Sequence, residues 1–201
     1  MASIPQQSAL ELALNYDSIP LSKRLAMQGT TKMTKNSVQT EVNWGAEINR
    51  VDPHSGYTPL MVAGINGNPE SVKTLIDRGA IVDYKEPTKG RTALICACKK
   101  GNPDAVSMLL HKGATLSVVD NNGMYPLMWA SKNGHLSCCK LLIEHGAGIN
   151  AFDSNAWTAI HFAAKYGHRE VVEFLAHSGA SIVLKEKLEE GKTPLMLAAQ
   201  Y

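Results

Sequence analysis

One phrase recurs four times along the 201-residue chain. It reads NGNPESVKTLIDRGA at 66–80, KGNPDAVSMLLHKGA at 100–114, NGHLSCCKLLIEHGA at 133–147 and YGHREVVEFLAHSGA at 166–180. The glycines that close it are 34, 33 and 33 residues apart: Gly79, Gly113, Gly146 and Gly179. A period of this length is typical of stacked repeats in which each unit is one supersecondary element.

Each unit is expected to contain two short helices. Thr58 and Pro59 suit the cap and first position of the first helix, and Gly67 suits its end. Asn68 and Asn102 are expected to cap the second helix. Helices of about ten residues are marginal alone in water, so each unit must cover its neighbour. Small residues at one first-helix position would allow a close approach: Ala63, Ala97, Ala130, Ala163 and Ala198.

The first-helix segments carry a family resemblance. They read TPLMVAGINGN, TALICACKKGN, YPLMWASKNGH, TAIHFAAKYGH and TPLMLAAQY. This pattern resembles the ankyrin repeat family, which implies an all-α solenoid of helix–turn–helix–hairpin units with a concave side. The family's histidine position is matched only by His161, so a polar network through that site should be mostly lost. Tyr125 replaces the capping threonine, which predicts a weaker helix start in that unit.

The repeat register predicts the organisation of the chain. Four complete repeats are expected at 52–85, 86–119, 120–152 and 153–185. We expect a partly helical lead-in at 1–19, a degenerate capping repeat at 20–51, and an incomplete repeat at 186–201 whose end frays.

Catalytic and metal-binding readings find little support in the sequence. The four cysteines align with apolar residues of other units, which favours a buried, reduced and metal-free role: Cys96, Cys98, Cys138 and Cys139. His135 and His168 align with Asn68 and Asn102, which favours a structural role. No nucleophile–base arrangement is evident, so we expect neither enzymatic activity nor a cofactor.

Charge and hydropathy bear on the kind of partner and on the cellular compartment. The formal net charge is only +2, which does not by itself indicate nucleic-acid binding. No apolar run approaches membrane-spanning length, and the first residues do not read as a secretory signal. These features favour the cytoplasm or nucleus.

The resemblance places a binding surface on the hairpin tips and the exposed ends of the first helices. These positions include an Arg or Lys in every unit from the second onward and no acidic residue, and several of their side chains are large and expected to be exposed. Such a strip favours a protein partner with an acidic segment and an apolar anchor. Its residues are Tyr57, Ile65, Asn66, Arg91, Lys99, Lys100, Met124, Lys132, Asn133, Trp157, Lys165 and Tyr166.

Two alternatives to a non-catalytic binding module or scaffold remain open. The chain could be the regulatory or targeting portion of a larger enzyme. A weaker alternative is nucleic-acid binding through the lysines of the strip. The resemblance also implies that hairpin asparagines such as Asn49 and Asn150 can be hydroxylated.

Overall fold

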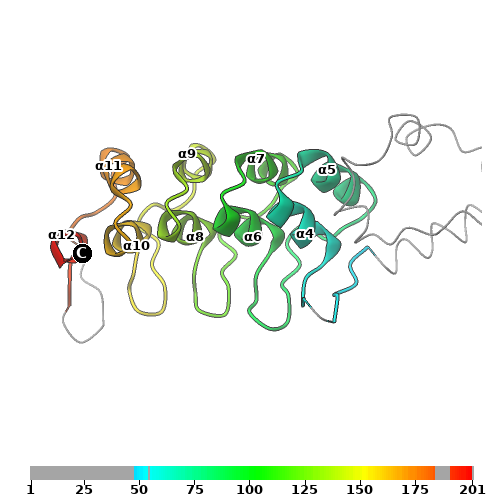
Figure 1. Cartoon of the computed structure of the whole chain (residues 1–201), viewed down its shortest axis with the longest axis horizontal. Helices are drawn as coiled ribbons and strands as arrows, with labels where there is room; N and C mark the ends of the chain where they lie inside the picture. The colour runs from blue at the N-terminus through cyan, green and yellow to red at the C-terminus, as the bar shows by residue number, and fades with distance from the viewer. Residues whose placement is uncertain (1–47, 54, 184–190, 201) are drawn as a thin grey trace, which may run out of the picture.

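The computed structural model describes residues 48–53, 55–183 and 191–200 as two rows of helices (Figure 1). The first helix of each unit lies in the inner row: α4 (Pro59–Asn66), α6 (Ala93–Lys100), α8 (Pro126–Lys132), α10 (Ala159–Lys165) and α12 (Pro194–Gln200). The second helix lies in the outer row: α5 (Pro69–Asp77), α7 (Pro103–His111), α9 (Leu136–Glu144) and α11 (Arg169–His177). The loops that join α5 to α6, α7 to α8 and α9 to α10 project from the inner row, away from the outer helices.

The described helices confirm the all-α solenoid. The expected lead-in at 1–19 lies outside the described residues, as does most of the expected capping repeat at 20–51. Of the expected incomplete repeat at 186–201, the structure describes residues 191–200, which include α12.

The inner helices begin and end where the sequence signals stand. Thr58 and Thr92 each accept a hydrogen bond from the backbone N–H three residues later, at 3.3 Å. Gly67 ends α4 at a φ of 76°, a left-handed conformation that glycine adopts without strain. Tyr125 makes no side-chain cap bond at the start of α8, as its replacement of threonine predicted.

Stacking is close along the inner row because the facing side chains are small. Ala63, Ala97, Ala130 and Ala163 are completely buried, at 0% exposure. A β-carbon placed on Gly64 would lie 3.0 Å from the carbonyl oxygen of Ala93 in the next unit, which is tighter than ordinary packing. The units therefore form one continuous core.

Hydrogen bonds from the start of each outer helix tie consecutive units together. Asn102 was predicted to cap α7, but its side chain makes no cap bond. Its amide nitrogen instead donates to the Gly64 and Ile65 carbonyls at 2.9 and 2.6 Å, because these carbonyls end the neighbouring α4. In later units His135 and His168 take this place, with Nε2 3.2 Å from the Lys99 carbonyl and 3.0 Å from the Lys132 carbonyl, respectively. These histidines therefore link units, which is the structural role expected for them.

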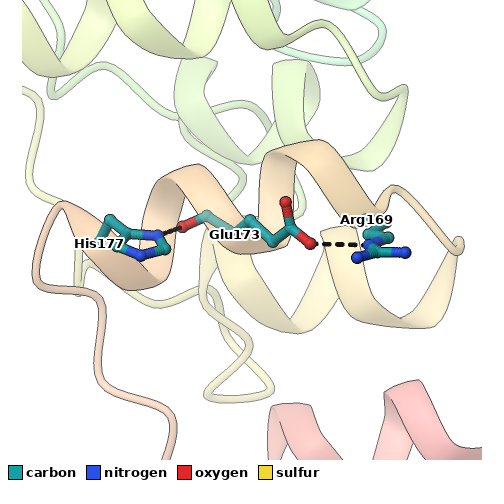
Figure 2. Close-up of polar contacts among 3 residues, drawn as sticks. All are labelled: Arg169, Glu173 and His177. Carbon is teal, nitrogen blue, oxygen red and sulfur yellow. Dashed lines mark hydrogen bonds and ion pairs between the residues drawn. The ribbon is translucent and has the colours of Figure 1, made fainter.

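The outer row presents side chains of both charges to solvent. Figure 2 shows α11, where Arg169 Nε lies 2.7 Å from Glu173 Oε1. One turn further along the helix, His177 Nδ1 lies 2.7 Å from the Glu173 carbonyl oxygen. Fully exposed pairs of this kind contribute little to stability, so this row owes its place to apolar packing.

Replacing His135 with alanine tests the link between units. His135→Ala removes the bond to the Lys99 carbonyl and the ring that packs on Gly101, so we expect a loss of about 1–2 kcal/mol in the free energy of unfolding. His135→Asn is the matched control, since Asn102 fills the equivalent place with an amide. Urea unfolding should show a clearly smaller loss for asparagine than for alanine; equal losses would contradict the role of the bond.

Ala156 provides a second test of the backbone geometry. It has a φ of 62°, whereas the equivalent position is a glycine in the other units, such as Gly123 with a φ of 75°. A left-handed alanine is strained by about 1–2 kcal/mol, while glycine gains about 0.4–1 kcal/mol of unfolded-state freedom. We expect Ala156→Gly to raise the free energy of unfolding by about 0.5–1 kcal/mol. A lower melting temperature in calorimetry would refute this strain.

Candidate functional site

The described helices divide by charge. The inner helices contain four basic residues and no acidic residue: Lys99, Lys100, Lys132 and Lys165. The acidic residues of the helices all lie on the outer row: Glu70, Asp77, Asp104, Glu144, Glu170 and Glu173. The inner helices therefore present a face of one sign, which we call the inner basic face and define by those four lysines.

Much of the sequence-predicted strip is accessible. Four of its residues are exposed: Asn66, Lys100, Asn133 and Tyr166. Five are half-buried: Tyr57, Ile65, Lys99, Lys132 and Lys165. Three are buried, contrary to the expectation that the large side chains stand out from the surface: Arg91, Met124 and Trp157, which are 7%, 5% and 6% exposed.

Trp157 is buried because the chain turns back onto the inner helix after the hairpin. Its backbone N–H donates to Asp153 Oδ1 at 2.8 Å, which fixes this return. The indole then packs 5.1 Å from the Phe162 ring, measured between centroids, and the Lys165 ammonium lies 4.8 Å from the indole centroid. The expectation that Trp157 is exposed on the strip is therefore wrong. Arg91 and Met124 hold the equivalent position and are buried with it.

Trp129 is the residue that sequence reasoning missed. Three cations lie close to its ring centroid: Arg91 Cζ at 4.9 Å, Lys99 Nζ at 5.1 Å and Lys132 Nζ at 5.2 Å. Trp129 aligns with Cys96 at a first-helix position that is apolar in every unit, so the repeat pattern alone predicts a core residue there. The signal was its place three residues before Lys132, which puts both side chains on one helix face. We call Arg91, Lys99, Lys132 and Trp129 the Trp129 cluster.

Lys132 of the Trp129 cluster also contacts aromatic rings of the following unit. The Lys132 ammonium lies 5.4 Å from the Tyr166 centroid and 5.8 Å from the Phe162 centroid, both in the next unit. Contacts of this kind contribute about 0.5–2 kcal/mol, depending on solvent exposure. Three of the four lysines of the inner basic face therefore lie against aromatic rings: Lys99, Lys132 and Lys165.

The buried hairpin carboxylates of Asp120 and Glu86 already accept hydrogen bonds from neighbouring groups. Asp120 accepts bonds from the Asn122 and Met124 N–H groups, and its Oδ2 accepts one from Trp129 Nε1 at 3.0 Å. Glu86 accepts bonds from the Thr88 and Lys89 N–H groups at 2.7 Å. Burial acts to raise the pKa of Glu86, but these hydrogen bonds outweigh it and hold the pKa below its ordinary value.

Within the part of the chain that the structure describes, the cations of the Trp129 cluster are not matched by direct ion pairs, although the Asp120 carboxylate accepts a hydrogen bond from the Trp129 indole. The Nε atom of Arg91 is buried and has no hydrogen-bond partner. The pKa of Lys99 is lowered, first by burial and then by the positive charges of Arg91 and Lys89.

The cysteines of the described residues lie in the core and not on the inner basic face. All four cysteines are buried and unpaired. Burial raises the pKa of Cys96 and Cys138 to about 12 and that of Cys139 to about 11. No group of three or more His, Cys, Asp or Glu side chains is placed to hold a metal among the residues described.

The chain belongs to the ankyrin repeat family. A family model described as "Ankyrin repeats (3 copies)" matches residues 10–120 and 113–186. Ankyrin repeats generally mediate protein–protein interaction, and they are typically non-catalytic modules. No curated protein sequence matches the chain. Among the described helices, none has the length and apolar character that crossing a membrane requires.

The burial of the cysteines predicts slow thiol chemistry. The thiolate is the reactive form, and a raised pKa leaves very little of it near neutral pH. We expect slow labelling of all four thiols in the native protein, fast labelling in denaturant, and no stoichiometric metal. Mass spectrometry of labelled protein and elemental analysis check this. Rapid native labelling of Cys98 and Cys139, or one zinc per chain, would contradict the core assignment.

Proposed function

We propose that this protein binds another protein through the inner basic face, and that the partner presents an acidic segment with an apolar anchor. The charge division between the two helix rows carries this proposal. Complementary charges steer encounter and select partners. The acidic segment would lie along the inner helices, where no acidic helix residue opposes it.

The apolar part of this contact needs an accessible aromatic residue. Tyr166 is 47% exposed and lies beside the Lys132 ammonium, so it replaces Trp157 as the proposed aromatic contact for the partner's apolar anchor. Ile65 and Tyr57, both half-buried, extend the same face toward the first described unit. Tyrosine is enriched at binding hot spots, since it combines a large ring with a polar tip.

The proposed setting is the cytoplasm or nucleus. Four unpaired, buried cysteines support it, because disulfides form and persist mainly in oxidising compartments.

Charge reversal on the inner basic face is the direct test. Lys99→Glu with Lys100→Glu should slow association with a partner recovered by pull-down, and added salt should diminish the difference between this variant and the wild type. The matched control is Lys73→Glu with Lys140→Glu, an equal charge change at exposed sites of the outer row. Surface plasmon resonance gives the rates, and circular dichroism checks the fold.

Tyr166→Ala, in the same assay, should weaken binding by about 2 kcal/mol. Trp157→Ala should mainly lower stability, because its ring is buried. If the Lys99→Glu/Lys100→Glu variant and Tyr166→Ala both stay folded and both bind as the wild type does, the proposal fails. Binding to nonspecific RNA or DNA with a steep salt dependence would favour the nucleic-acid alternative instead.

A further inference from the structure

We infer that the Trp129 cluster receives a phosphorylated side chain, phosphoserine or phosphothreonine, within the partner's acidic segment. This inference rests on the function proposed above and specifies what the partner carries at one point of the inner basic face. Three observations support it: the convergence of cations, the unpaired donor, and the restriction of this arrangement to one place among the described units.

The convergence joins two consecutive units. Arg91 and Lys99 belong to the unit of α6: Arg91 precedes this helix, and Lys99 lies in its last turn. In the next unit, α8 ends at Lys132 and also contains Trp129. All three cations lie 4.9 to 5.2 Å from one ring centroid. The face of the ring offers them a quadrupole but no counter-charge.

The unpaired donor is the Nε of Arg91, one nitrogen of a guanidinium that makes no ion pair with the described residues. Arg91 is 7% exposed, and its Nε has no hydrogen-bond partner. A buried charge without a partner is destabilising. An anion that contacts the Lys99 and Lys132 ammonium groups would also bring negative charge near the Arg91 guanidinium, since all three cations lie close to the same ring.

The number of cations favours a phosphate over a carboxylate. A phosphorylated serine carries a charge of about −1.5 to −2 and three strong acceptor oxygens, whereas a carboxylate carries one charge. The nearest carboxylates that contact the cluster or its flanks are Asp120 and Glu86. Both are engaged by hairpin N–H groups, so they position the cluster and leave its cations unpaired.

The cluster occurs once, which favours a single modified residue over a polyanion. The position of Arg91 holds Tyr57, Met124, Trp157 and Lys192 in the other described units, and the unit of Lys192 has Leu197 where Trp129 stands, so no second convergence of three cations on one ring forms among them. A nucleic-acid backbone repeats its phosphates at regular spacing and would be matched by an equally regular row of sites.

The first experiment compares peptides that differ at one residue. Three fluorescent mixtures of short acidic peptides share random flanks and carry phosphoserine, glutamate or serine at the centre. The full 201-residue chain is titrated into each, and anisotropy is recorded. We expect the phosphoserine mixture to bind about tenfold more tightly than the glutamate mixture.

Substitutions within the cluster then locate the preference. Arg91→Met should keep the fold, because Met124 occupies the equivalent buried position, and it should not lower the melting temperature, since it removes an unpaired charge. It should abolish the preference for phosphoserine. Lys132→Met should also abolish the preference for phosphoserine, and it provides the test if Arg91→Met fails to fold. The control is Lys140→Met on the outer row, which changes charge equally and should leave the preference intact.

The remaining outcomes overturn the inference in distinguishable ways. Equal binding of the phosphoserine and glutamate mixtures, both above serine, removes the phosphate but leaves the proposed acidic partner. Tight binding of inorganic phosphate without a gain from phosphoserine identifies a free-anion site. Stronger competition by RNA or by phosphoinositide vesicles identifies another ligand class. If no mixture binds while capture of the partner still depends on Lys99 and Lys100, only the phosphate inference fails.

Discussion

The fold depends on the burial of apolar faces on helices that are too short to exist alone. The described helices span seven to nine residues, below the length at which an isolated helix is stable in water. Each is stabilised by the equivalent helix of the next unit, and the alanine at the contact sets how closely the two approach. Because every unit meets its neighbour in the same way, equivalent residues line up in rows along the molecule.

Because of these rows, residues that recur at one position of the repeat lie next to each other on the surface. Lys99, Lys132 and Lys165 occupy one inner-helix position in three consecutive units, so a single residue type becomes a line of charge. The acidic residues of the helices occupy outer positions by the same logic. The electrostatic division of the molecule therefore follows from where each charge falls within the repeat, although the net charge is small.

Local signals were sufficient to predict the helices but not the direction of every side chain. Thr58 and Gly67 mark the ends of α4 because capping and left-handed backbone depend on neighbours in sequence. Trp157 could not be placed this way, since its burial depends on the bond to Asp153 and on contact with Phe162. Trp129 was recognisable as a core position, but its contact with Arg91 and Lys99 of the preceding unit depends on how two units are spaced.

The stacking of lysines on rings has a consequence for the entropy of recognition. A free lysine side chain gives up as much as about 2 kcal/mol of rotamer freedom when it is immobilised. Lys132, held between Trp129 and Tyr166, has already lost much of that freedom on folding. Preorganised groups bind more tightly for the same contacts, and they demand a ligand of matching spacing. This surface should thus discriminate between acidic partners by the distance between their charges, as a rigid template does.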